Sequence, residues 1–184
     1  MIRLFVGLDL PLDIKKQLQN LQRGMPTALW RPMEKMHLTL RFIGNIEEEL
    51  LAEEVLKELR YVRFPAFHFS LKGIGYFARS DVPHHIWAGV DEDKAIRELQ
   101  EKIDSAVKKA GAGQEDKFKF TPHVTLGKLY GADMGDVYRY IQANNLFHTE
   151  PFQAISFTLY QSIARENGEG KYYKEIEEFP LMLV

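Results

Sequence analysis

The chain has 184 residues, of which 45% are hydrophobic and 27% charged, proportions that are ordinary for a soluble globular protein. The absence of cysteine excludes disulfides, thiol catalysis and cysteine-based zinc sites. The formal net charge of −2 argues against a protein that coats nucleic acid nonspecifically, but it leaves room for a local basic pocket. No apolar run approaches the roughly 18 residues of a membrane span, and the first residues do not read as a signal peptide. We therefore expect a cytoplasmic protein without membrane association.

Hydrophobic periodicity predicts alternating strands and helices through the first half of the chain. The predicted elements are, in order, a strand over 2–10, a helix that starts at Pro11 and ends before Gly24, a loop over 25–32, a strand over 37–43, a helix to about Tyr61, and strands over 66–72 and 84–90. Asn45 and Glu48 predict a capping box at the start of the second helix. Gly73 and Gly75 predict a turn that separates the last two strands.

The second half repeats this order in outline. It predicts a helix over about 92–110, a strand that follows Pro122 and ends at Gly131, a helix opened by Asp133 and Asp136, and a final hairpin of strands over about 152–164 and 172–179. The repetition predicts an internal duplication, and hence a bilobal α+β fold with pseudo-twofold symmetry and antiparallel sheets. We see no linker between independent domains, so residues 1–184 are expected to form one domain of two intertwined lobes with helices on the outside.

One four-residue pattern occurs once in each half, as His37-Leu-Thr-Leu and His123-Val-Thr-Leu. Side chains two residues apart in a strand point to the same face. Each copy therefore places an imidazole and a hydroxyl on one face and two apolar side chains on the other. Two such strands brought together would surround a small anion with His37, Thr39, His123 and Thr125, which is a site suited to phosphate chemistry.

Histidine suits this chemistry because its ordinary pKa near 6.5 lets it act as acid or base at neutral pH. Thr39 and Thr125 would hold the non-bridging phosphate oxygens, and Lys128 is a candidate for a nearby cation. Lys128 has the wrong strand parity, however, and reaches the site only if Gly127 permits a bulge. Zinc sites usually use three or more His, Cys, Asp or Glu ligands, and threonine is a poor one, so we predict no metal site. The adjacent His84 and His85 lie in a turn-like setting and are expected at the surface.

With both motifs present, the sequence resembles the 2H phosphoesterase superfamily, and most of all its bacterial and archaeal RNA 2′,3′-cyclic phosphodiesterases, also called 2′-5′ RNA ligases. The resemblance covers nearly the whole chain. Besides the two motifs it rests on Arg3-Leu-Phe-Val-Gly-Leu-Asp-Leu-Pro, Trp30, Gly73-Ile-Gly-Tyr-Phe-Ala-Arg79, Ile86-Trp-Ala-Gly-Val90 and Phe120-Thr-Pro. It implies a 2H phosphoesterase domain with a V-shaped cleft between two lobes, each contributing one motif.

The resemblance also implies an activity without metal or cofactor, the hydrolysis of an RNA 2′,3′-cyclic phosphate end to a 2′-phosphate. One histidine would activate water and the other would protonate the departing 3′ oxygen, with His123 as base and His37 as acid by analogy. Members also join RNA ends through a 2′-5′ linkage. Many relatives have Arg where this chain has Lys128, and a lysine cannot make the bidentate phosphate contact of an arginine. The expected partner is an RNA with a cyclic phosphate end, such as a tRNA half, and the protein is expected to be a monomer.

Five further residues are candidates for RNA contacts, two of them cationic and three aromatic. Single-stranded RNA is commonly held by stacking its bases on aromatic rings. The aromatic candidates are Trp30, Tyr76 and Phe77, which lie in predicted loops or turns. The cationic candidates are Arg31 and Arg41, which lie near the first motif, and Arg41 has the strand parity of His37. Phe77 and Trp87 could equally be core residues. Two other functions remain open, a phosphodiesterase acting on small cyclic nucleotides and a non-catalytic module that binds single-stranded RNA.

Overall fold

The computed structural model describes residues 2–113, 119–166 and 170–183. Its elements are β1 (Ile2–Asp9), α1 (Leu12–Asn20), β2 (Ala28–Trp30), a 3₁₀ turn η1 (Met33–Lys35), β3 (His37–Ile46), α2 (Glu49–Arg60), β4 (Phe67–Arg79), β5 (Val82–Asp91), α3 (Lys94–Lys109), β6 (His123–Leu129), α4 (Met134–Asn144), β7 (Phe152–Ala154), β8 (Ser156–Ala164) and β9 (Lys171–Pro180). Among the described residues, no helix is long and apolar enough to cross a membrane.

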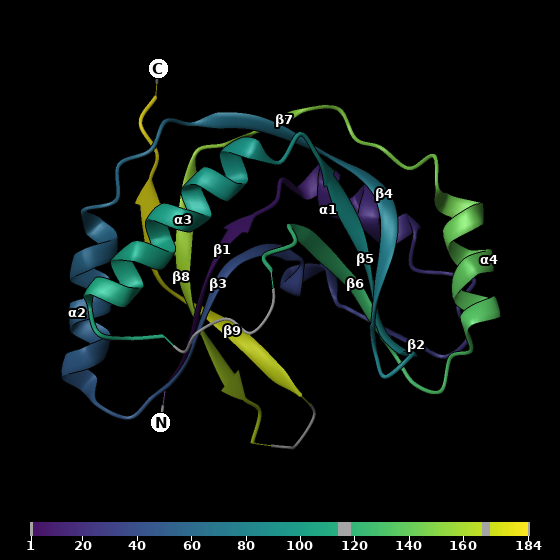
Figure 1. Ribbon diagram of the computed structural model, residues 1–184, viewed down its shortest axis with the longest axis horizontal. Helices are drawn as coiled ribbons and strands as arrows, with labels where there is room; N and C mark the ends of the chain where they lie inside the picture. The colour runs from purple at the N-terminus through teal and green to yellow at the C-terminus, as the bar shows by residue number, and fades with distance from the viewer. Residues whose placement is uncertain (1, 114–118, 167–169, 184) are drawn as a thin grey trace.

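The strands form one antiparallel sheet in the order β7-β4-β5-β6-β3-β1-β8-β9, with β2 added to β6. The two motif strands β3 and β6 are neighbours at its centre, paired through Leu38 and Val124. In this order four strands lie on each side of that junction, and β2 adds a fifth to the side of β6. The C-terminal hairpin β8–β9 joins the side that contains β1 and β3. Helices α2 and α3 cover one flank and α4 lies on the opposite flank (Figure 1). The predicted α+β class with antiparallel pairing and outer helices is confirmed.

Both motif strands contain the same irregularity, at the last residue of the motif. In β3 the register with β1 skips Leu40, and in β6 the register with β5 skips Leu126. Each skipped residue is a β-bulge, which reverses the facing of the side chains that follow. The alternation of burial shifts at the same point in both strands. Phe42 and Lys128, which hold equivalent positions, therefore lie on the exposed side of the sheet.

The bulge in β3 overturns the expected position of Arg41. Simple alternation put Arg41 on the face of His37 and Thr39, but its side chain is buried on the opposite face. There its Nε lies 2.9 Å from Oδ1 of Asp104 on α3. A buried guanidinium held by a helix carboxylate does not reach an RNA backbone, so the predicted RNA contact of Arg41 is wrong.

Two local predictions in the first half are also wrong, and one in the second half is confirmed. Asn45 lies within β3, and α2 starts at Glu49 without a side-chain cap. Gly73 and Gly75 do not form a turn, because β4 runs unbroken through them and the chain reverses only after Arg79. The predicted cap of α4 is present, since the side chain of Asp133 accepts a 2.8 Å hydrogen bond from the backbone N–H of Asp136.

Gly75 serves packing rather than turning. The indole of Trp87, on the neighbouring strand β5, lies across Gly75 so closely that a Cβ there would be 2.2 Å from the ring. Trp87 in turn lies beside the second motif histidine, with ring centroids 5.7 Å apart. The missing side chain at Gly75 therefore determines where the indole beside His123 can lie.

We expect Gly75→Ala to lower the free energy of unfolding by about 1–3 kcal/mol, because the added methyl group overpacks the indole. Urea denaturation measures this change. The matched control is a double-mutant cycle, since Gly75→Ala made in a Trp87→Leu background should cost far less once the ring is absent. An equal cost in both backgrounds would contradict this explanation.

Candidate active site

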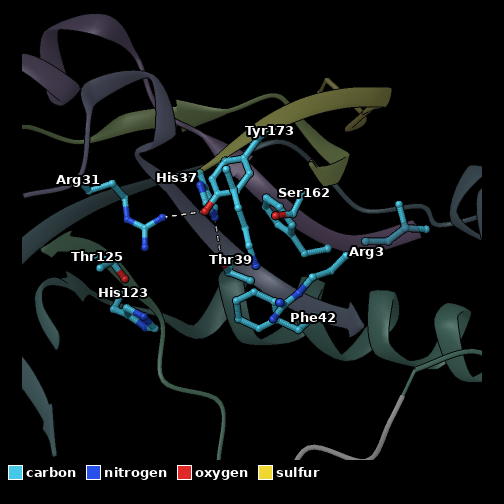
Figure 2. Close-up of a pocket in the computed structure, with 12 residues that line it drawn as sticks. Arg3, Arg31, His37, Thr39, Phe42, His123, Thr125, Ser162 and Tyr173 are labelled. Carbon is cyan, nitrogen blue, oxygen red and sulfur yellow. Dashed lines mark hydrogen bonds between the residues drawn. The ribbon is translucent and has the colours of Figure 1, made fainter. Parts of the chain in front are cut away.

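The two motifs meet at one pocket of about 170 Å³ on the exposed face of the sheet (Figure 2). His37 and Thr39 come from β3, and His123 and Thr125 come from β6. The other lining residues come from β1, the segment after β2, the end of β3, and the hairpin β8–β9: Arg3, Leu4, Phe5, Arg31, Phe42, Ser162, Lys171 and Tyr173. The structure thus brings two imidazoles and two hydroxyls around one space.

The ring of His37 is held in one orientation by both of its nitrogens. Nδ1 donates a 2.8 Å hydrogen bond to the carbonyl oxygen of Lys35, so in the neutral ring Nε2 accepts from the hydroxyl of Thr39 at 2.9 Å. The ring stacks on Phe5, with centroids 4.9 Å apart, and lies edge-on to Tyr173 at 5.3 Å. Burial, aided by the charge of Arg31, lowers the pKa of His37 from 6.5 to about 4.

The ring of His123 is held through the equivalent Nδ1 bond. Its Nδ1 donates a 2.6 Å hydrogen bond to the carbonyl oxygen of Thr121, again two residues before the histidine. The ring lies edge-on to Phe77, with centroids 4.8 Å apart. Burial lowers the pKa of His123, and the charge of Arg31 acts in the same direction, while the Thr121 carbonyl opposes them. In both motifs the backbone carbonyl selects the tautomer with its lone pair on Nε2.

Arg31 is the cation that acts on both imidazoles. In Figure 2 its guanidinium lies between the side of the pocket that holds His37 and the side that holds Thr125. Nη1 donates a 2.9 Å hydrogen bond to the hydroxyl of Tyr173. Within the described part of the chain, its buried Nε has no hydrogen-bond partner. A guanidinium that lines a small pocket is suited to hold an anion there.

The backbone of Arg31 is fixed to the second motif strand. Its N–H donates a 2.8 Å hydrogen bond to the carbonyl oxygen of Leu126, the residue at the bulge. The amide of Gln22 donates to the carbonyls of Arg31 and Leu126, at 2.6 and 3.0 Å. The position of Arg31 is therefore set by the same strand that carries His123 and Thr125.

The bulge that Lys128 needed to reach the face of the motif residues is present, but Lys128 does not line the pocket. The bulge before it turns its side chain to the exposed face. Its ammonium nevertheless lies over the ring of Tyr130, 4.9 Å from the centroid.

His85 is paired with Lys128 across the ladder and is half-buried in β5 rather than in a surface turn as expected. Burial, followed by the charge of His84, lowers the pKa of His85 to about 4.

The three aromatic candidates are separated by the structure. Phe77 lies against His123 on the pocket side of β4. Tyr76, the preceding residue of the strand, faces Tyr138 of α4, with ring centroids 6.3 Å apart. Trp30 is half-buried in β2, where its ring lies 5.9 Å from that of Tyr140. None of the three is among the residues that line the pocket. All three belong to strands rather than to the loops that were expected, and Tyr76 and Trp30 face α4.

Sequence reasoning missed seven residues of the pocket. They are Arg3, Leu4, Phe5, Phe42, Ser162, Lys171 and Tyr173. Six of them come from β1 and the terminal hairpin, whose positions beside β3 are long-range pairings with no local signal. Phe42 is brought to the pocket by the bulge. Among the described residues, no three His, Cys, Asp or Glu side chains are grouped to hold a metal ion.

Comparison with known families and proteins gives consistent matches. Residues 10–165 match the model of the 2′-5′ RNA ligase superfamily. A Thermotoga maritima protein named RNA 2′,3′-cyclic phosphodiesterase is 35% identical over 133 residues, which are 70% of each chain. An Aeropyrum pernix protein of the same name is 31% identical over 79% of this chain and 81% of its own. A third protein of that name, from Archaeoglobus fulgidus, is 28% identical over 97% of this chain and 99% of its own.

Solved structures support the fold independently. E. coli LigT in its apo form superposes with a TM-score of 0.78 at 20% identity, over 98% of both chains. E. coli LigT complexed with 3′-AMP gives a TM-score of 0.78 at 23% identity, also over 98% of both chains. At this level of identity, the likeness establishes the fold.

In the free protein we expect His37 to titrate near pH 4 and His123 below 6.5, because both rings are buried near the Arg31 charge. Both rings are therefore neutral at pH 7. NMR titration of the ring Cε1–H signals measures the two values. Arg31→Met should raise both pKa values.

Lys128→Met is the matched control for this titration. It should leave the pKa values of His37 and His123 unchanged while raising that of His85, on which the Lys128 charge acts. A His37 signal that titrates near 6.5 in the unaltered protein would contradict the structure.

Proposed function

Because the chain belongs to the 2′-5′ RNA ligase superfamily, we propose that it hydrolyses the 2′,3′-cyclic phosphate at the end of an RNA to a 2′-phosphate. The observation that carries this proposal is the single pocket lined by both His-Thr pairs. Opening a cyclic phosphodiester needs one group to take a proton from water and another to return a proton to the leaving oxygen. Two imidazoles whose Nε2 atoms face one space suit these tasks, because imidazole can accept a proton in its neutral form and donate one in its charged form.

The proposed reaction has one step at phosphorus. The base takes a proton from water, the water oxygen bonds to phosphorus, and the P–O3′ bond breaks as the acid protonates O3′. We assign His123 as base and His37 as acid by analogy with the family. Because the pKa of His37 is low in the free protein, its acid role requires the bound phosphate anion to raise that pKa. A ribose hydroxyl in place of water would form a 2′-5′ linkage by the same bond changes.

The non-bridging oxygens gain charge in the transition state and need donors. Thr39 and Thr125 supply hydroxyls from the pocket face of their strands. We propose that Arg31, rather than Lys128, supplies the cation, since Arg31 lines the pocket and Lys128 lies over Tyr130. The Tyr173 hydroxyl holds one end of the guanidinium and leaves other N–H groups for the phosphate.

Two details of the proposal go beyond the cyclic phosphate itself. We propose that the protein acts as a monomer in the cytoplasm and that tRNA halves are among its substrates.

Phe77 is retained as a candidate stacking surface because its ring lies against that of His123. A small cyclic nucleotide as the physiological substrate is the second candidate, since the two His-Thr pairs address only the cyclic phosphate, which such a nucleotide also carries.

His37→Ala and His123→Ala should each lower kcat by about 10²–10⁴-fold, because each removes one proton-transfer group. The assay uses an RNA with a 2′,3′-cyclic phosphate end in excess EDTA, with the 2′-phosphate product identified by mass spectrometry. Activity lost in EDTA and restored by a divalent ion would contradict metal independence. Activity that survives both substitutions would contradict the proposed acid and base, whereas an unaltered protein that binds the RNA without hydrolysing it would be a non-catalytic RNA-binding module.

The acid and base can be separated with a substrate in which sulfur replaces the bridging O3′. A thiolate leaves without protonation, because a thiol is far more acidic than an alcohol. His37→Ala should therefore regain most of its lost activity on the sulfur substrate, whereas His123→Ala should not. Rescue of His123→Ala alone would reverse the two assignments.

Arg31→Met should lower kcat/KM by about 10–100-fold, the usual value of a charged hydrogen bond to an anion. Arg31→Lys should recover part of this loss, because it restores the charge without the planar geometry. Lys128→Met is the matched comparison and should change kcat/KM by less than about threefold. A larger loss at Lys128 than at Arg31 would show that the cation has been assigned to the wrong residue.

A further inference from the structure

The pocket extends beyond the two motifs on one side only. In Figure 2 the motif residues of β6 lie at one end, and Arg3 and Phe42 lie at the other end, beyond His37 and Thr39. Lys171 also lines the pocket. These three residues, which we call the Arg3–Phe42–Lys171 subsite, have no part in the proton transfers described above.

The subsite is built on the sheet rather than on loops. Arg3 of β1 lies opposite Ser162 of β8, which lies opposite Tyr173 of β9. Lys171 is two residues before Tyr173 on β9, and therefore has the same facing. Arg3 is likewise two residues before Phe5, whose ring stacks on His37. The strand ladder thus places two cations one step along the sheet from the first motif histidine.

The two cations of the subsite lack acidic partners. Across residues 2–113, 119–166 and 170–183, neither Arg3 nor Lys171 forms an ion pair with a carboxylate. Together with Arg31 they give the pocket three cationic side chains and no acidic lining residue. The chain as a whole has a net charge of −2, so this cationic lining is a local feature. Such a surface attracts a second phosphate beside the reacting one.

Phe42 is a large aromatic ring that remains exposed beside these cations. Its side chain is 59% exposed, although it lies 6.1 Å from the ring of Phe5. The bulge at Leu40 turns it to this face, and the equivalent bulge in β6 presents Lys128 instead. The two motif strands therefore differ after their bulges, because Phe42 lines the pocket and the equivalent Lys128 does not. An exposed ring next to phosphate-binding cations is a typical stacking surface for a base.

We propose that the Arg3–Phe42–Lys171 subsite binds the nucleotide that carries the cyclic phosphate and the phosphate at its 5′ side. Phe42 stacks the terminal base, and Arg3 and Lys171 bind the phosphate that joins this nucleotide to the rest of the RNA. The inference rests on the proposed function and adds a direction, because the RNA chain leaves the pocket over β1 and β9. The protein then prefers an RNA end over a cyclic mononucleotide, which lacks that phosphate.

The test compares three substrates: a nucleoside 2′,3′-cyclic phosphate, the same compound with a 5′-phosphate, and a dinucleotide ending in the cyclic phosphate. We expect kcat/KM about tenfold higher for the second and third than for the first, the usual effect of a charged hydrogen bond. In the Arg3→Gln/Lys171→Gln double variant this ratio should fall to about one. The dependence of log kcat/KM on log salt for the dinucleotide should weaken by about 0.7, as for one phosphate contact on a single strand.

Lys174→Gln is the control for the loss of a lysine charge from β9, because Lys174 is an exposed lysine of that strand that does not line the pocket. It should leave the substrate ratio unchanged. Phe42→Leu should raise KM about tenfold for all three substrates, since each carries a base. Thermal unfolding of each variant checks that it is folded. A ratio near one in the unaltered protein, or an equal loss in Lys174→Gln, would overturn the subsite.

Binding separates failure of the subsite from failure of the proposed reaction. Calorimetry with a nucleoside 2′-phosphate, with and without a 5′-phosphate, measures the same preference without turnover. If no substrate is hydrolysed but the 5′-phosphate still tightens binding about tenfold, and the double variant loses this effect, the subsite stands and the hydrolytic proposal fails. If the 5′-phosphate does not tighten binding, the subsite is refuted whatever the activity.

Discussion

The antiparallel contact between β3 and β6 is the constraint on which the site depends. These strands come from distant parts of the chain and pair at the centre of the sheet through Leu38 and Val124, whose side chains are fully buried. Since alternate residues share a face, burying this pair in the core turns the flanking histidines and threonines to the other face. The pocket is therefore a consequence of core packing. A slip of one residue in either strand would remove half of it.

The bulges at the last residue of each motif are a second determinant of the pocket. Each one reverses the facing of the strand, so that an arginine enters the core at one strand and a glycine at the other, while Phe42 and Lys128 reach the exposed side. The glycine at position 127 lies against the ring of Trp30, where a Cβ would be 2.9 Å from a ring carbon. The two halves thus share a backbone plan but differ in side chains. That difference gives a nearly symmetric fold a pocket with two unlike ends.

Much of this plan could be predicted from the sequence because its signals are local. Strand alternation, helix spacing and the repeated His-x-Thr pattern depend only on neighbouring residues, and they gave the fold class and the residues that line the centre of the pocket. The errors arose where a distant contact decides the outcome. Gly75 resembles a turn residue until Trp87 is seen across it, and Arg41 appears exposed until the bulge is known. The pairing of Tyr173 with Arg31 spans 142 positions and has no sequence signal.

The electrostatics of the pocket link these features to its chemistry. Burial and the Arg31 charge keep both imidazoles neutral in the free protein, so the cationic lining is not repelled by histidine charges. A bound phosphate reverses this balance, because its negative charge lies close to the rings and favours the imidazolium form. The anion that is to be cleaved would therefore raise the pKa of the group that must donate a proton to its leaving oxygen. A low pKa in the free state is then compatible with an acid role, because the proton is needed only while the anion is bound.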